Sequence, residues 1–179
     1  MNGERFWSIV EDARTEMGSD SELVAQALLR RLRALPPDEI EQFQEHWEQA
    51  RDEAYRWPII DAATLLLGPM GDSLELQDWI VSHGRETVQR LQDDPDSMVE
   101  LVPDRHNARI DWFCGLAMEA HIAATGAPFT VDGPPGLYEP LGTPVDLTDE
   151  ASARRQFPRL TAYLDNNRWI PRPWERPAD

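Results

Sequence analysis

The sequence predicts an all-α protein, an irregular bundle of six to seven helices around a central hydrophobic helix at about residues 107–124. Three observations favour this fold class. Apolar residues recur at helical spacing in six stretches, and no stretch alternates apolar and polar residues as a half-buried strand would. Prolines and glycines separate the stretches. Nine of the fifteen prolines fall at or after Pro128, which predicts a proline-rich C-terminal loop and tail.

Four helices are predicted in the first part of the chain. The first spans about residues 4–17, and the second runs from a capping site near Asp20 to about residue 35. Pro36 and Pro37 stop the second helix and start the third, which Pro58 ends after Trp57. A short apolar helix follows at about 59–67. The outer face of the third helix is acidic and includes Glu41, Glu45, Glu48, Asp52 and Glu53.

Three further helices are predicted after a turn at residues 68–71. A long helix at about 73–91 contains Gly84, which costs about 1 kcal/mol relative to Ala and so indicates a close backbone neighbour. The hydrophobic helix at 107–124 follows, then a loop at 127–147 and a last helix at about 149–164. We expect a single domain over 1–165 and a tail of Arg, Pro and Trp at 166–179, more consistent with folding back on the domain than with docking elsewhere.

The net charge of the chain is −16. Residues 1–101 hold 22 acidic residues and 9 Arg, whereas residues 102–179 hold 11 acidic residues and 8 Arg, so the acidity belongs to the first part. Phosphate backbones and anionic lipids attract the opposite charge, so nucleic acid and membrane surfaces are not expected partners. The acidic helix at 38–53 could bind a basic protein partner, or the charge could serve solubility alone.

Features of the sequence also indicate a compartment. No apolar run approaches the roughly 20 residues that span a bilayer. The start, Met1 to Arg5, lacks the basic flank and apolar stretch of a signal peptide. Cys114 is the one cysteine and cannot form an intramolecular disulfide, which fits a reducing compartment. We therefore expect a soluble, cytoplasmic protein.

Five landmark segments follow one another along residues 4–125. They are Phe6-Trp7-x-x-Val10-x-x-Ala13-Arg14, Leu35-Pro36-Pro37-x-Glu39-Ile40-x-x-Phe43, Ala54-Tyr55-Arg56-Trp57 followed by Ala62-Ala63, Trp79-Ile80-Val81-x-x-Gly84-Arg85-Glu86 and Asp94-Pro95-Asp96. Their order resembles the bacterial DUF4240 family, a helical domain of unknown function. The resemblance implies a helical fold and no particular activity. In that family an Arg and aromatic residues often precede the Trp of the fourth segment, where this chain has Leu74, Leu76 and Gln77.

Well-known catalytic and metal-binding motifs do not occur in the sequence. It has no cysteine pair, no His-Glu-x-x-His, no phosphate-binding loop and no Gly-x-Ser-x-Gly, so we expect no cofactor and no metal site. Cys114 and His121 are two helical turns apart, too far for a nucleophile and its base to touch, and Cys114 is interpreted as a core residue. His121 lies on the core-facing stripe, either as a hydrogen-bonded buried histidine or as a ligand or base.

The best candidate site combines the helices at 59–67 and 73–91. Asp61 is the one charged residue between Trp57 and Met70, so it needs a partner if it is buried, unless it interacts with the amides of its own first turn. Arg85 could pair with Asp61 or with Asp78, or it could hold an anionic ligand. Other polar groups border the same stripe. The candidate ligand-binding residues are Trp57, Asp61, Trp79, His83, Arg85 and His121.

Two functional hypotheses follow. The first is a protein-interaction or regulatory module whose acidic surface meets a basic partner, with an immunity protein that neutralises a basic toxin as a special case. The second is a small-molecule-binding protein or an enzyme with a site near Asp61, Trp79, His83 and Arg85. The sequence itself favours the first, since it contains no catalytic motif.

Overall fold

The computed structural model describes residues 1–68, 73–130, 136–168 and 170–175, and all the regular elements in these ranges are helices. The all-α class is confirmed. Nine α-helices and two 3-10 helices lie in the described ranges, more than the six to seven expected, because two predicted helices are each divided. They are α1 (Gly3–Met17), α2 (Ser21–Leu32), α3 (Pro37–Ala54), α4 (Trp57–Leu67), α5 (Leu74–Ser82), α6 (Arg85–Asp93), η1 (Pro95–Asn107), α7 (Leu116–Thr125), α8 (Glu150–Gln156), α9 (Pro158–Asn166) and η2 (Pro173–Glu175).

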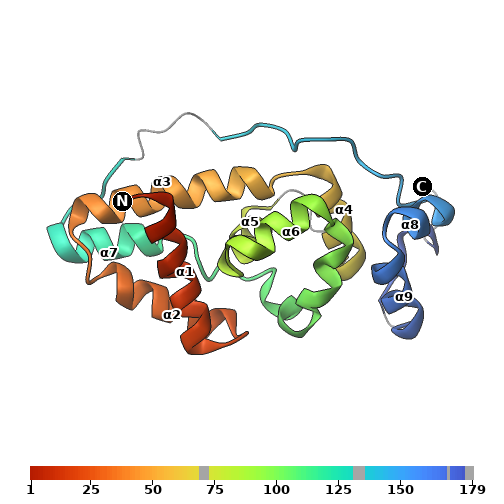
Figure 1. The fold of residues 1–179 in the computed structure, drawn as a ribbon, viewed down its shortest axis with the longest axis horizontal. Helices are drawn as coiled ribbons and strands as arrows, with labels where there is room; N and C mark the ends of the chain where they lie inside the picture. The colour runs from red at the N-terminus through yellow and green to blue at the C-terminus, as the bar shows by residue number, and fades with distance from the viewer. Residues whose placement is uncertain (69–72, 131–135, 169, 176–179) are drawn as a thin grey trace.

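One hydrophobic core lies among α1, α2, α3 and α7, at one end of the molecule (Figure 1). Phe6, Phe43 and Trp47 pack together there, with ring centroids 5.0–6.3 Å apart. The helix starts are satisfied locally, because Asn2 caps α1 and Asp20 caps α2 through their side chains. Pro36 and Pro37 open α3 as expected.

A second core lies among α4, α5, α6, η1, α8 and α9. Its most enclosed helix is α5, in which seven of nine residues are buried, from Leu76 to Ser82. Trp79 in the middle of α5 is fully buried. Val81, on the neighbouring face of α5, belongs to the first core, so α5 joins the two.

The prediction of a helix at 107–124 is wrong for its first half, and the part that is helical does not lie at the centre of the bundle. Asn107 ends η1, and residues 108–115 form turns before α7 begins at Leu116. Gly115 has a φ of 72°, which no residue inside a right-handed helix adopts, and Asp111 accepts a hydrogen bond from the amide of Cys114. Cys114 is therefore exposed rather than in the core. Only three residues of α7 are buried.

Two other predicted helices are divided. The helix expected at 73–91 breaks at Gly84, which has a φ of 92° and caps α6. A Cβ at this position would lie 3.3 Å from the side chain of Glu11 in α1, so the close neighbour is a side chain rather than a backbone. The helix expected at 149–164 breaks at Phe157, because Pro158 cannot continue the hydrogen bonding of α8.

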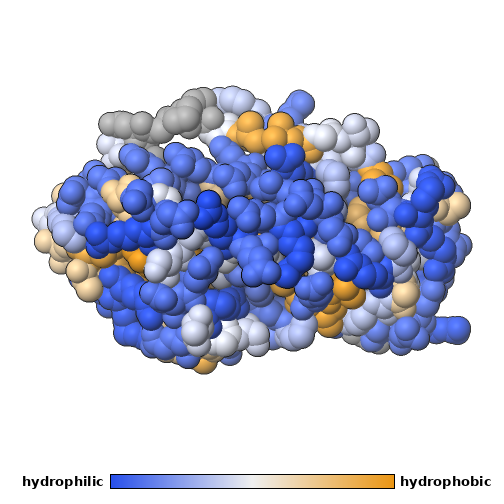
Figure 2. Space-filling view, viewed as in Figure 1, coloured by the Kyte–Doolittle hydropathy of each residue, from blue (hydrophilic) through white to orange (hydrophobic). Residues whose placement is uncertain are grey.

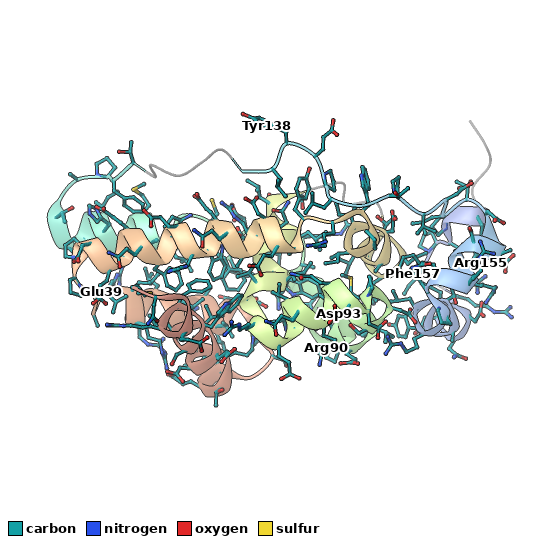
Figure 3. All side chains as sticks on the ribbon, turned by 45° about the horizontal axis from the view of Figure 1, so that its top comes forward. Glu39, Arg90, Asp93, Tyr138, Arg155 and Phe157 are labelled. Atoms are coloured by element: carbon teal, nitrogen blue, oxygen red, sulfur yellow. The ribbon has the colours of Figure 1, made fainter. Side chains whose placement is uncertain are left out.

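The described part of the predicted loop, residues 136–147, forms an extended strap along the outside of α3 and α4 (Figure 1). Asp52 accepts from the amide of Leu137, and a short parallel bridge joins Leu141 to Arg56. Tyr138 is 86% exposed and points away from the molecule (Figure 3). The strap is thus tied to the body at separate points while it displays an aromatic side chain.

The strap leads to α8 and α9, which lie at the opposite end of the molecule from α7 (Figure 1). Helix α9 packs on α4 and η1. The described part of the predicted tail contributes Ile170, which is buried in the second core. Figure 2 shows a mostly hydrophilic face, with apolar residues along the strap and near the boundary with these C-terminal helices.

Candidate functional site

The six sequence-predicted site residues do not form one site. Trp79 and His83 lie together in α5 and at its C-cap, with ring centroids 5.0 Å apart. Asp61 and Trp57 contact the strap. Arg85 lines an open cleft beside α1, and His121 contacts α3. Each of these locations is described in turn below.

Trp79 and His83 border a buried polar network centred on Asp104 of η1. The indole Nε1 of Trp79 donates to Asp104 Oδ2 at 2.8 Å, and Ser21 Oγ donates to the same oxygen at 2.5 Å. The amide of Asn107 donates to Asp104 Oδ1 at 2.7 Å. His83 Nε2 lies 3.2 Å from Asp104 Oδ2. One carboxylate therefore links α2, α5 and η1.

A cation completes this network. Arg14 NH1 lies 3.8 Å from Asp104 Oδ2, while the rest of its guanidinium donates to Ser82 Oγ at 2.8 Å and to the Ser82 carbonyl at 3.1 Å. Burial alone would raise the pKa of Asp104, but the contacts with His83, Ser21, Asn107 and Trp79 outweigh it and hold that pKa well below its ordinary value.

The same surroundings also determine the protonation state of His83. Burial lowers the pKa of His83, and the neighbouring Asp104 opposes this only in part. Serine, histidine and aspartate thus meet, but Ser21 donates to Asp104 and not to His83, so the contacts of a catalytic triad are not formed. Ser21 is fully buried and Asp104 is 2% exposed. A substrate cannot reach these atoms, and the network stabilises the fold.

Asp61 is buried, as its apolar helix suggested, but its partner is the strap. Asp61 Oδ2 accepts from the amide of Val145 at 2.7 Å, so the alternative of first-turn amides in its own helix is wrong. Burial raises the pKa of Asp61, and the hydrogen bond from Val145 opposes the rise in part. The backbone amide of Trp57 donates to the Leu141 carbonyl at 2.9 Å. These two predicted site residues fasten the strap.

The expected pairing of Arg85 with Asp61 or Asp78 is wrong. Arg85 NH1 contacts Glu4 Oε1 at 2.5 Å, and its side chain is 44% exposed. It is the first residue of α6, on the far side of the break at Gly84, which turns it toward α1. Asp78 instead accepts from the indole of Trp47 at 2.6 Å and lies 3.7 Å from Arg51.

Arg85 lines a cleft of about 380 Å³ between the start of α1, the C-terminal half of α3 and the start of α6. The size is at the lower end of small-molecule pockets. Arg85 is the only one of the six predicted site residues that lines it. The lining residues are Asn2, Gly3, Glu4, Phe6, Trp7, His46, Gln49, Ala50, Glu53 and Arg85.

His121 has ordinary polar partners. Its Nδ1 lies 2.9 Å from the carbonyl of Ala127 and its Nε2 lies 3.1 Å from Glu41 Oε1. These contacts tie α7 to α3 and match the alternative of a hydrogen-bonded buried histidine. Burial and the nearby Asp111 raise the pKa of the Cys114 thiol, which disfavours the reactive thiolate.

The acidic outer face of α3 is partly engaged by the chain itself. Glu41 contacts His121, Glu48 contacts Arg51, and Asp52 accepts from the strap. Glu45 and Glu53 are exposed and form no ion pair with the described residues, and Glu53 lines the cleft. Of these two unpaired acids, one therefore belongs to the cleft.

Sequence reasoning missed the centre of the buried network. Asp104, Ser21 and Arg14 come from three distant segments, and no spacing rule connects them. The useful signal was the pair Trp79 and His83 on a helix of otherwise apolar buried residues, since a buried indole N–H and a buried imidazole both require a polar partner. Among the described residues, no three His, Cys, Asp or Glu side chains gather as metal ligands would.

Comparisons with known proteins agree with the resemblance noted from the sequence. The family described as "Protein of unknown function (DUF4240)" matches residues 1–122, which include α1 to α6, η1 and most of α7. No curated protein and no solved structure gives a match. In the described part of the chain, no helix combines the length and the apolar character that a bilayer crossing requires. With the family matched over more than half of its residues, this chain belongs to the DUF4240 family.

Proposed function

We propose that this protein is a cytoplasmic interaction module that binds a basic protein partner through the exposed acidic side of α3 next to the cleft. One observation carries the proposal. Glu45 and Glu53 are exposed and form no ion pair with the described residues, in a chain whose net charge is −16. Complementary charge steers a partner and selects among competitors more than it adds affinity.

The surroundings of these residues support a binding face. Glu53 borders the cleft together with Trp7 and Arg85, and Glu4 is 80% exposed beside them. Arg85 is the only arginine among the described residues that line the cleft, against the two carboxylates of Glu4 and Glu53, so acidic groups prevail there. Tryptophan and arginine are enriched at protein interfaces relative to the rest of the surface. An immunity protein that neutralises a basic toxin would be one member of this class.

The test compares partner capture by variants of equal charge. Glu45→Gln/Glu53→Gln removes two charges from the proposed face, and Asp93→Asn/Glu139→Gln removes two from exposed positions elsewhere. A basic protein retained by the wild type and the control pair, but lost by the first pair and by raised salt, supports the proposal. A partner that is acidic, or that the first pair retains fully, contradicts it.

A small-molecule-binding role is the second candidate, and the cleft of about 380 Å³ favours it. Only Arg85 of the expected constellation lines this cleft, so the candidate site moves away from Asp61, Trp79 and His83. A thermal-shift screen of small metabolites tests it, since a ligand that binds the folded state raises the melting temperature. The shift should disappear in Arg85→Ala. Because the Arg85 side chain is exposed, that variant should keep the stability of the wild type.

A further inference from the structure

We propose that α8 and α9 can dock on the α4–η1 face of a second copy of this chain, so that two copies exchange these helices and form a reciprocal dimer. The face belongs to the family-matched part, residues 1–122, whereas the docking helices lie outside it. The occupant of the face in one molecule is thus a separate C-terminal segment, and an identical segment on another molecule fits the face equally well.

The docking contact has a polar centre that α9 cannot supply itself. Phe157 precedes α9 and provides no side-chain cap. Asp96 of η1 provides the missing cap, because it accepts hydrogen bonds from the backbone amides of Arg159 at 2.8 Å and Leu160 at 2.9 Å. Arg159 Nε also donates to Asp96 at 3.1 Å, and its NH2 group pairs with Asp94.

Apolar contacts surround this polar centre. Phe157, Leu160 and Leu164 are fully buried in the same core as Met98 and Leu101 of η1. Figure 3 places Phe157 on the side of the C-terminal helices that faces the body, and Arg155 on the outer side. Helices of seven and nine residues are too short to be stable alone. After any opening, α8 and α9 are therefore ordered again only by docking, on their own body or on another.

The connection between the body and these helices allows them to dock either on their own body or on that of a second molecule. Between Thr125 and Glu150 the described residues contain no helix, and the strap is held at a few points such as the amides of Leu137 and Val145. Figure 1 shows the strap, residues 136–147, passing over α3 and α4 toward the C-terminal helices. Twenty-four residues can span up to about 80 Å when extended, enough to reach a neighbouring molecule. Intramolecular docking prevails at low concentration, and exchange grows with concentration.

Complementation between two charge-reversed chains tests the exchange. In Asp96→Arg, the face repels Arg159 of its own chain, and in Arg159→Asp, the helix repels Asp94 and Asp96 of its own chain. An exchanged heterodimer restores one wild-type contact and forms one reversed contact. Light scattering should then show a doubling of molar mass in the mixture but not in either variant alone. Fluorophores on the exposed Cys114, the one cysteine of the chain, should show energy transfer.

A matched control uses Arg154→Asp, which reverses a charge on α8 whose partners, Glu150 and Asp165, belong to the C-terminal helices themselves. Its mixture with Asp96→Arg should stay monomeric. A second experiment uses the wild-type chain alone, labelled with either a donor or an acceptor fluorophore. Mixing the two preparations at high concentration and warming them briefly should give dimers with energy transfer. A monomeric mass in both the complementary mixture and this second experiment overturns the proposal, as does equal dimerisation with Arg154→Asp.

Discussion

Asp78 and Asp104 are both buried and each accepts a hydrogen bond from an indole N–H, yet their surroundings move their pKa values in opposite directions. Burial raises the pKa of Asp78 to about 6, since Trp47 and the more distant Arg51 compensate only in part. At Asp104 the contacts with four side chains outweigh burial. The number of donors around a buried carboxylate therefore decides whether its charge stabilises the fold.

Asp104→Asn should lower the free energy of unfolding at pH 7 by about 3–5 kcal/mol, because it removes a charge on which buried donors and Arg14 converge. Since the folded pKa of Asp104 lies below its ordinary value, its contribution is present above about pH 4 and is lost as the pH falls further. Urea unfolding at several pH values measures both effects. A loss below about 1 kcal/mol would show that Asp104 is not the centre of the network.

Asp78→Asn should raise the free energy of unfolding at pH 7, the opposite of the effect expected for Asp104→Asn. The folded pKa of Asp78 is raised from 3.8 to about 6, so ionisation between these values destabilises the folded state. At about 1.4 kcal/mol per pKa unit the effect approaches about 3 kcal/mol. Asparagine keeps an acceptor for Trp47 without the charge, so the variant should be more stable than the wild type at pH 7 and equal to it near pH 4. Lower stability at pH 7 would contradict the assignment.

Gly84→Ala should destabilise the protein by about 1–3 kcal/mol, because Gly84 has φ 92° and ψ 168°, a region that is almost restricted to glycine. The added Cβ would also lie 3.3 Å from Glu11. Gly3→Ala is the matched control: Gly3 is in the first turn of α1 and a Cβ there meets nothing within 4 Å. Thermal unfolding should show a lower melting temperature only for the first variant.

Asp61→Ala should loosen the strap, since the amide of Val145 loses its acceptor, at a cost of about 1–3 kcal/mol. Asp61→Asn retains an acceptor oxygen and should keep the strap in place. Hydrogen exchange reports this directly, because the Val145 amide should exchange faster in the alanine variant. Unchanged exchange in both variants would mean that Asp61 does not hold the strap.

Duplex DNA and RNA should not bind at physiological salt, given a net charge of −16. Two of the arginines that could contribute to a basic patch near the C-terminal end are paired with acids. Arg154 contacts Glu150 and Asp165, and Arg159 contacts Asp94 and Asp96. A salt-sensitive shift in a gel assay would refute this prediction.

Local sequence rules predicted most of the fold. Helix starts at Asn2, Asp20 and Pro37 depend on caps and prolines that act within a few residues. The break at Gly84 was not predicted, because an isolated glycine is also tolerated inside a helix and only the contact with α1 decides between the two. The segment at 108–115 is apolar enough for a helix, but the left-handed Gly115 prevents it from continuing into α7 as one helix.

The candidate sites depended on long-range contacts, and there the sequence was a weaker guide. Asp61 was recognised as a buried acid needing a partner, but its partner Val145 lies 84 residues away in a loop. The expected pairing of Arg85 with Asp61 or Asp78 requires a helix that is continuous through Gly84. The turn at Gly84 places Arg85 beside Glu4, 81 residues earlier in the chain. Neither pairing leaves a periodic signal in the sequence.

The cap that Asp96 gives to α9 also sets an order of events during synthesis. A ribosome makes Asp96 and the apolar residues of η1 well before Arg159 and Leu160, which need them. Until the last helices emerge, the nascent body must keep a carboxylate and an apolar face in water that the finished molecule buries. Completion of the C-terminal helices therefore covers an apolar surface of the kind that promotes aggregation during folding.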